Sequence, residues 1–196
     1  MRQVLIVVWL MLQLFGAAYH FGPGQRRLAL DEATGLAAEA DRLAAAGQWQ
    51  QAFEKYNQAL SRLPEGQQEL ERRIRLARAK VQMMISQLPA AHDALQVLVD
   101  ELAGEQGAAG PDSKLLAEAR EALAHAKFYM TWLMRLEGVP RERWEPMIES
   151  SRELLRLLAE RATGPDRKRH LEDLEAAVRL ARMDLAELQA LPLPSQ

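Results

Sequence analysis

The feature of this sequence that most restricts its fold is a pair of helical patterns joined by a glycine. Leu36, Ala40 and Leu43 are spaced by four and three residues, which places them on one face of a first helix. Gly47 can adopt the left-handed conformation that ends a helix, and Pro64 cannot continue the second one. Between these two residues, aromatic and small side chains recur at helical spacing: Trp49, Ala52, Tyr56, Ala59 and Leu60. Packed helices approach to about 8–10 Å, which alanines at the crossing permit, so the segment predicts an antiparallel helical hairpin.

These residues resemble the tetratricopeptide repeat. The second half of that family's consensus is matched by the run Gly47-x-Trp49-x-x-Ala52-x-x-x-Tyr56-x-x-Ala59-Leu60-x-x-x-Pro64. The three residues of the first helix match the first half of the consensus. The resemblance implies a right-handed stack of helix pairs, a solenoid, that binds peptides or proteins on its inner face.

A second unit follows with weaker agreement. Its spacing is that of the first hairpin moved by 39 residues, so that Ala79 corresponds to Ala40 and Ala91, Leu95 and Leu98 correspond to the buried face of the second helix. The family period is about 34 residues, and the extra residues fit at 65–68. Ser86 stands where a glycine is expected, and Leu88 stands where the family has a large aromatic residue.

Two further helices are predicted after the glycine-rich segment at 104–113. The first begins at a cap formed by Asp112 or Ser113 and runs to Leu136. Its partner ends near Arg161. Pro146 is tolerated best in a first turn, so this partner helix is expected to begin near Glu145 rather than at Arg141.

The last predicted helix begins at residues 163–166 and is amphipathic. Its apolar residues alternate spacings of three and four, namely Leu171, Leu174, Val178, Ala181, Leu185 and Leu188. A terminal helix of this kind covers the open end of a solenoid, and a dimerising coiled coil is the alternative. Carboxylates such as Glu172 and Asp173 lie on the polar side and are expected to be solvated.

The N-terminal segment at residues 4–21 is apolar, with Gln13 as its only strongly polar residue before Tyr19. An uncleaved signal anchor, with the domain on the extracytoplasmic side of the membrane, is the favoured interpretation. A cleaved signal peptide that releases a secreted protein is the alternative, because Gly16-Ala17-Ala18 supplies small residues for a cleavage site. The predicted organisation is therefore an anchor or signal with a hinge at Gly22-Pro23-Gly24 (residues 1–24), an all-α domain (25–190) and a tail (191–196).

Composition and motifs exclude several functions. The absence of cysteine excludes disulfides, thiolate metal sites and cysteine nucleophiles, and 25 basic against 27 acidic residues give no basic excess for nucleic acid. No two histidines are spaced for a metal on one helical face, and no catalytic motif occurs. We therefore expect no enzyme activity, catalytic residue, cofactor, metal or small-molecule substrate. His125, Tyr129 and Trp132 share a face that is either a packed aromatic stripe or a ligand-contacting patch.

The expected function is that of a membrane-anchored adaptor or scaffold. In tetratricopeptide arrays the first helix of each pair lines the inner surface, which by resemblance assigns a partner-binding role to Asp41, Arg73, Leu76, Lys80 and Met83. The ligand implied is a protein or peptide, of acidic or amphipathic character, that meets Arg73 and Lys80. A carboxylate clamp is not expected, because Ala37 and Asp41 stand at its positions. Two alternatives remain: a merely solvated charged helix, and a structural subunit assembled permanently in a larger membrane complex.

Overall fold

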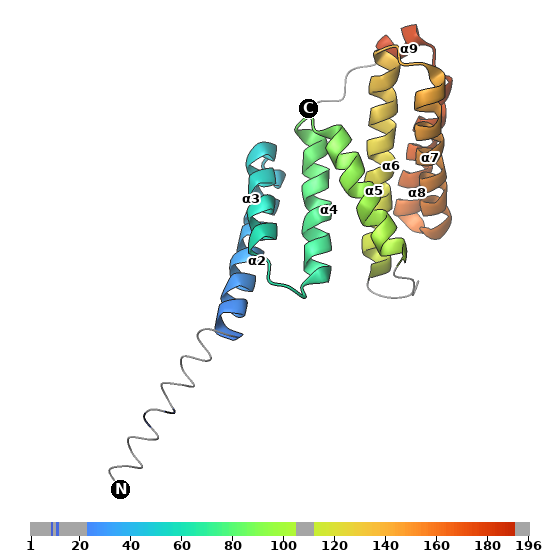
Figure 1. Cartoon of the computed structure of the whole chain (residues 1–196). Coiled ribbons are helices and arrows are strands. Elements are labelled where there is room, and N and C mark those ends of the chain that lie inside the picture. The colour runs from blue at the N-terminus through green and yellow to red at the C-terminus, as the bar shows by residue number, and fades with distance from the viewer. Residues whose placement is uncertain (1–8, 10, 12–22, 105–111, 191–196) are drawn as a thin grey trace. The chain divides into compact units, whose positions relative to one another are not determined.

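The computed structural model describes residues 9, 11, 23–104 and 112–190, and every regular element within these ranges is helical. The helices are α2 (Pro23–Ala45), α3 (Trp49–Arg62), α4 (Gln68–Met84), α5 (Leu88–Gly104), α6 (Asp112–Leu136), α7 (Arg141–Arg161), α8 (Gly164–Arg182) and α9 (Leu185–Gln189) (Figure 1). The predicted all-α class is confirmed for this part of the chain. Apart from residues 9 and 11, the predicted anchor or signal segment lies outside the described residues, as does the tail at 191–196.

The chain divides into two compact units, Met1–Ile74 and Arg75–Gln196, with the boundary inside α4. In the described ranges, the first unit contains α2, α3 and the beginning of α4, and the second contains the rest of α4 and the helices after it. None of the helices in these ranges combines the length and the apolarity that crossing a membrane requires.

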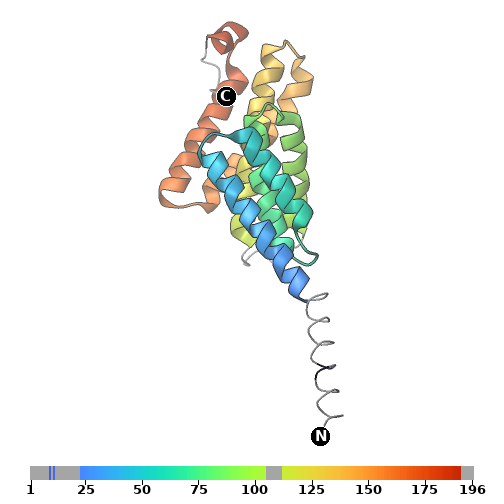
Figure 2. The same cartoon turned by 90° about the vertical axis from the view of Figure 1, so that its left-hand side faces the viewer.

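In the first unit, α2 and α3 form the predicted hairpin and lie side by side (Figure 2). Ala40, Ala52 and Ala59 are completely buried, as the close approach of two helices requires. Pro23 and Gly24, predicted to form part of a hinge, are the first residues of α2 and therefore helical.

Three helices end in the same way. In each case the second residue after the helix has a positive φ: Gly47 (72°), Ser86 (59°) and Gly138 (71°). In each case the next amide donates a hydrogen bond back to the carbonyl five residues earlier: Gln48 to Leu43 (2.9 Å), Gln87 to Gln82 (3.1 Å) and Val139 to Met134 (2.8 Å). This is the Schellman arrangement, which satisfies the carbonyls at a helix end and reverses the chain.

The helices that follow these three turns share a burial pattern. The fourth, eighth and eleventh residues are buried in each of α3, α5 and α7: Ala52, Tyr56 and Ala59; Ala91, Leu95 and Leu98; Trp144, Ile148 and Ser151. The correspondence predicted between the first two hairpins is therefore confirmed. The third hairpin has the same pattern although its residues depart from the consensus.

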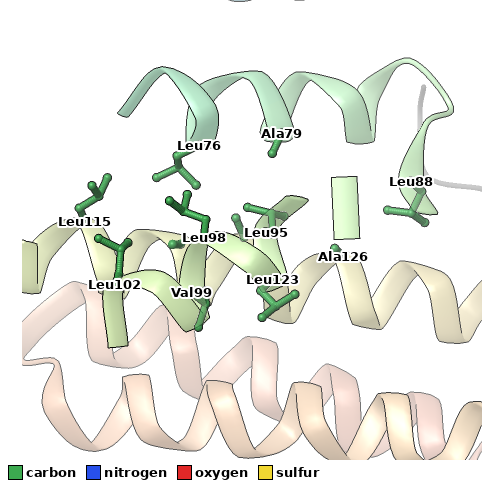
Figure 3. Packing of buried hydrophobic residues seen from close by; sticks show 12 residues of the cluster. Leu76, Ala79, Leu88, Leu95, Leu98, Val99, Leu102, Leu115, Leu123 and Ala126 are labelled. Carbon is green, nitrogen blue, oxygen red and sulfur yellow. The ribbon is translucent and has the colours of Figure 1, made fainter. Parts of the chain in front are cut away.

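Two clusters of buried residues form the core of the second unit. In the first cluster, Leu76 and Ala79 of α4 face α5 and α6 side chains such as Leu98 and Leu115 (Figure 3). The second cluster joins the later helices through Trp132, Trp144, Ile148, Leu155, Ala177, Leu180 and Leu188. Both clusters are formed by the apolar faces of amphipathic helices.

The predicted start of α7 near Glu145 is wrong, because α7 begins at Arg141 and Pro146 lies inside it. The additional turn buries Trp144 in the second cluster, with the guanidinium of Arg135 at 4.8 Å from the ring centroid. Arg141 and Glu145 form an ion pair across the same turn. Burial of a large aromatic side chain contributes about 1.5–3 kcal/mol, which is similar in size to the cost of about 3 kcal/mol for proline inside a helix.

The prediction of one continuous last helix is also wrong, because α8 and α9 are separate. The carboxylate of Asp184 accepts a hydrogen bond from the amide of Glu187, and the Glu187 carboxylate accepts one from the amide of Asp184, so a capping box starts α9. The guanidinium of Arg135 donates to the carbonyls of Leu180 and Met183 at the end of α8. These bonds satisfy backbone groups that would otherwise favour continuation of the helix.

The apolar stripe predicted for this region is only partly buried. Leu171 and Leu185 are 45% and 47% exposed. The buried residues are His170, Ala177, Leu180 and Leu188. Leu174 and Ala181 pack against the second cluster. At spacings of three and four they fit both the predicted stripe and the buried one that contains His170 and Ala177. The periodicity alone therefore did not define the buried face of the helix.

Candidate functional site

The residues predicted to bind a partner belong to both units. Asp41 and Arg73 lie in the first unit, whereas Leu76, Lys80 and Met83 lie in the second. They are therefore considered separately, by the helix that carries each of them.

Asp41 lies on α2 and forms a hydrogen bond with a side chain of α3. Its carboxylate accepts a hydrogen bond of 2.5 Å from the hydroxyl of Tyr56, which is itself buried. Burial, together with this bond and the charge of Asp41, raises the pKa of Tyr56 above its ordinary value, so the hydroxyl keeps its proton. Asp41 thus contributes to the packing of α2 on α3, and the sequence analysis missed this link.

Arg73 and Lys80 are exposed and lie on the same helix, α4. The guanidinium of Arg73 forms an ion pair of 2.5 Å with Glu69 one turn earlier. No acidic side chain in the described ranges lies within ion-pair distance of Lys80. Lys80 can therefore meet an acidic group without first giving up a partner.

Leu76 and Met83 have different surroundings from the two cations. Leu76 is only 3% exposed and belongs to the first core cluster, so it offers no accessible surface in this structure. Met83 is half-buried and packs against that cluster. Met84, which the sequence analysis did not select, is exposed at the end of α4. In this part of α4, Lys80 and Met84 are accordingly exposed, and Met83 is partly accessible.

Two further arginines of α4 belong to the internal structure of the second unit. The guanidinium of Arg75 forms an ion pair of 2.7 Å with Glu101 of α5. Arg78 is half-buried, and its pKa is lowered mainly by burial and further by the charge of Arg75. The positive charge of this helix is thus partly used in packing α4 against α5.

The three residues of the predicted stripe, His125, Tyr129 and Trp132, have different surroundings in the structure. Trp132 is buried in the second cluster, and Tyr129 is half-buried against both clusters. His125 instead faces α8, where its Nε2 lies 3.2 Å from Oδ2 of Asp173. Asp173 was expected to be solvated, and this contact shows that it is in fact half-buried against α6.

The contact between His125 and Asp173 belongs to a larger polar cluster on α6 and α8. Glu121, His170 and Asp173 each offer a ligand atom, and these atoms lie within 4.8 Å of one another. No single helix carries this cluster, because the packing of α6 against α8 assembles it. The available signal was a histidine beside a carboxylate at helical spacing, once on each helix: Glu121 with His125, and His170 with Asp173.

Comparison of the sequence with protein-family models and with curated proteins, and of the structure with solved structures, gave no significant match.

Proposed function

We propose that this chain is a membrane-anchored adaptor that binds a protein or peptide through the exposed part of its tetratricopeptide-like helical hairpins. The observation that carries this proposal is the threefold recurrence of one hairpin, with the same turn and the same buried positions. Arrays of repeated helical hairpins present extended surfaces whose outward residues are free to vary, and such surfaces are typical of scaffolds.

Lys80 is the centre of the proposed partner surface. It is exposed, it has no acidic neighbour within ion-pair distance in the described ranges, and it precedes the exposed side chain of Met84 by one turn. A cation beside a flexible thioether fits an acidic, amphipathic peptide, because the ammonium attracts a carboxylate and methionine adapts to apolar side chains. Arg73 lies two turns earlier on α4 and adds a second positive charge, although its pairing with Glu69 reduces that contribution.

The proposal is tested by affinity purification of the full chain with its partners. The double variant Arg73→Ala/Lys80→Ala is compared with wild type and with the control Lys168→Ala/Arg179→Ala, which removes two exposed cations from α8. We expect wild type and the control to retain the partner. The double variant should recover about tenfold less partner, which corresponds to a loss of about 1.4 kcal/mol in the free energy of binding. For wild type, recovery should decrease between low and high salt, because salt screens exposed charges.

Equal recovery for all three proteins at every salt concentration would contradict an electrostatic surface on α4. If the same partner also resisted high salt in a fixed stoichiometry, the chain would be a permanent subunit of a complex and not an adaptor.

A further inference from the structure

Four ionisable side chains of the second unit meet between α6 and α8 and are not part of the proposed adaptor surface. Glu121 and His125 lie one turn apart on α6, and His170 and Asp173 lie three residues apart on α8, so each helix directs two of them to one side. One ring nitrogen of His170 and one carboxylate oxygen each of Glu121 and Asp173 lie within 4.8 Å of one another. His125 joins the group through its 3.2 Å contact with Asp173.

His170 is the member of this group whose environment most needs an explanation. The residue is 5% exposed, and its Nδ1 is buried with no hydrogen-bond partner in the protein. Leaving a buried polar atom unsatisfied costs about 1–3 kcal/mol. A leucine at this position would avoid that cost and would extend the apolar face of α8. A buried imidazole that has an unsatisfied nitrogen, and one ring nitrogen within 4.8 Å of two carboxylate oxygens, points to a ligand that the ring can bind.

We propose that Glu121, His170 and Asp173 bind a divalent transition-metal ion of the zinc class. One imidazole nitrogen and two carboxylate oxygens are ligands that Zn²⁺ and Co²⁺ accept, whereas Mg²⁺ and Ca²⁺ prefer oxygen ligands alone. Ligand atoms at about 2.0–2.2 Å from a tetrahedral ion are about 3.4 Å apart, so side-chain rotation can bring atoms that lie within 4.8 Å into place. The ion joins α6 to α8 inside the second unit.

His125 acts as a positioning residue. Its contact with Asp173 holds that carboxylate in place, as partners of metal ligands commonly do. Arg169 has the opposite effect, because its guanidinium lies 3.3 Å from Glu121 and competes with the ion for that carboxylate. Arg169 is 53% exposed and also lies 3.5 Å from Asp166, so it can move toward Asp166 when the ion binds.

The test uses the untagged full chain, stripped of metal and titrated with Co²⁺ and separately with Zn²⁺. We expect one Co²⁺ per chain with visible d–d absorption, and a melting temperature that rises with Zn²⁺ because the ion binds the folded state. His170→Gln and Asp173→Asn should each weaken binding at least tenfold. His125→Gln should weaken it about 10–100-fold, as expected for a positioning residue. Arg169→Ala should strengthen it.

The control is His92→Gln, which removes a histidine that also contacts an aspartate, Asp93 at 2.9 Å, but on α5. It should bind Co²⁺ and Zn²⁺ as wild type does. The proposal is overturned if wild type shows no saturable binding of either ion, or if Asp173→Asn, a substitution at a half-buried position, retains full affinity. Equal effects of Mg²⁺ and Zn²⁺ on the melting temperature would also overturn it. Circular dichroism of every variant separates loss of the site from loss of the fold.

Discussion

Ser86 has a φ of 59° at the position that Gly47 occupies, with a φ of 72°, in the first hairpin. The left-handed region costs a residue with a Cβ atom about 1–2 kcal/mol, and glycine avoids this cost. The structure therefore explains how a serine can stand where the repeat favours glycine. Ser86 thus adopts, between α4 and α5, a backbone conformation that is unfavourable for a serine.

We predict that Ser86→Gly stabilises the protein. Glycine relieves the strain but loses more conformational entropy on folding, so the free energy of unfolding should rise by about 0.5–1 kcal/mol. The reciprocal variant Gly47→Ser should lower it by about 1 kcal/mol, because a Cβ added there meets no atom within 4 Å and only the backbone conformation opposes it. Urea denaturation of both variants measures these changes. If both substitutions changed stability in the same direction, the proposed equivalence of the two turns would fail.

The hydrogen bond between Tyr56 and Asp41 leads to a prediction about alkaline pH. Burial and the neighbouring carboxylate raise the pKa of Tyr56 in the folded state above the unfolded value of 10.0. Its contribution to stability is then fully present below about pH 10 and is lost as the pH rises further, because only the unfolded state releases the phenolic proton. Tyr56→Phe should cost about 1–2 kcal/mol at pH 8. The difference from wild type should shrink between pH 9 and pH 11.

The measurement for Tyr56 is the free energy of unfolding of both proteins at each pH. Lysines titrate equally in the two proteins, so their effect cancels in the difference. Parallel curves for wild type and Tyr56→Phe would show that the phenol has an ordinary pKa in the fold.

At the scale of the helix, hairpin packing depends on alanines where α2 crosses α3. Ala52 is completely buried there, so Ala52→Leu should overpack the crossing and cost about 1–3 kcal/mol. The control is Ala38→Leu on the exposed side of α2, which should change stability by less than about 0.5 kcal/mol. Thermal denaturation compares the two variants. An unchanged melting temperature for Ala52→Leu would mean that the assigned register of the first repeat is incorrect.

The sequence was a good guide at a helix end that a glycine determines, although the local capping box of Asp184 and Glu187 was missed. Gly47 ends a helix where predicted, because few other residues adopt a positive φ readily. The sequence was a poor guide where tertiary packing determines where a helix begins or ends. Burial of Trp144 extends α7 past Pro146, and the guanidinium of Arg135, which lies 45 residues before Leu180, binds the carbonyls where α8 ends. No local pattern contains either contact.

The same distinction applies to the candidate sites. Exposure of Arg73 and Lys80 follows from charge and could be predicted, but the burial of Leu76 depends on which side of α4 faces α5 and α6. The cluster around His170 joins residues about fifty positions apart in the sequence. Helical spacing could identify the two halves of that cluster, but only the packing of α6 and α8 brings them together.

For the whole molecule, we predict attachment to a membrane through residues 4–21. These eighteen residues are almost entirely apolar. At 1.5 Å per residue, a helix of this length spans about 27 Å, close to the hydrocarbon thickness of about 30 Å. A soluble protein would not expose such a segment without cost, so the full chain should sediment with membranes and resist extraction by carbonate or high salt.

The membrane prediction is tested by fractionation of cells that produce the full chain. Leu10→Arg/Leu12→Arg places two charges in the apolar segment and should release the protein, because each charge at the centre of a membrane helix costs about 2.5–3.5 kcal/mol. The control Arg26→Ala/Arg27→Ala removes two charges beyond the segment, in the first turns of α2, and should leave sedimentation unchanged. Recovery of a soluble wild-type protein whose first residue lies near Tyr19 would identify the segment as a cleaved signal peptide. In that event the adaptor would act without an anchor, and its partner would be sought among secreted proteins and not at the membrane.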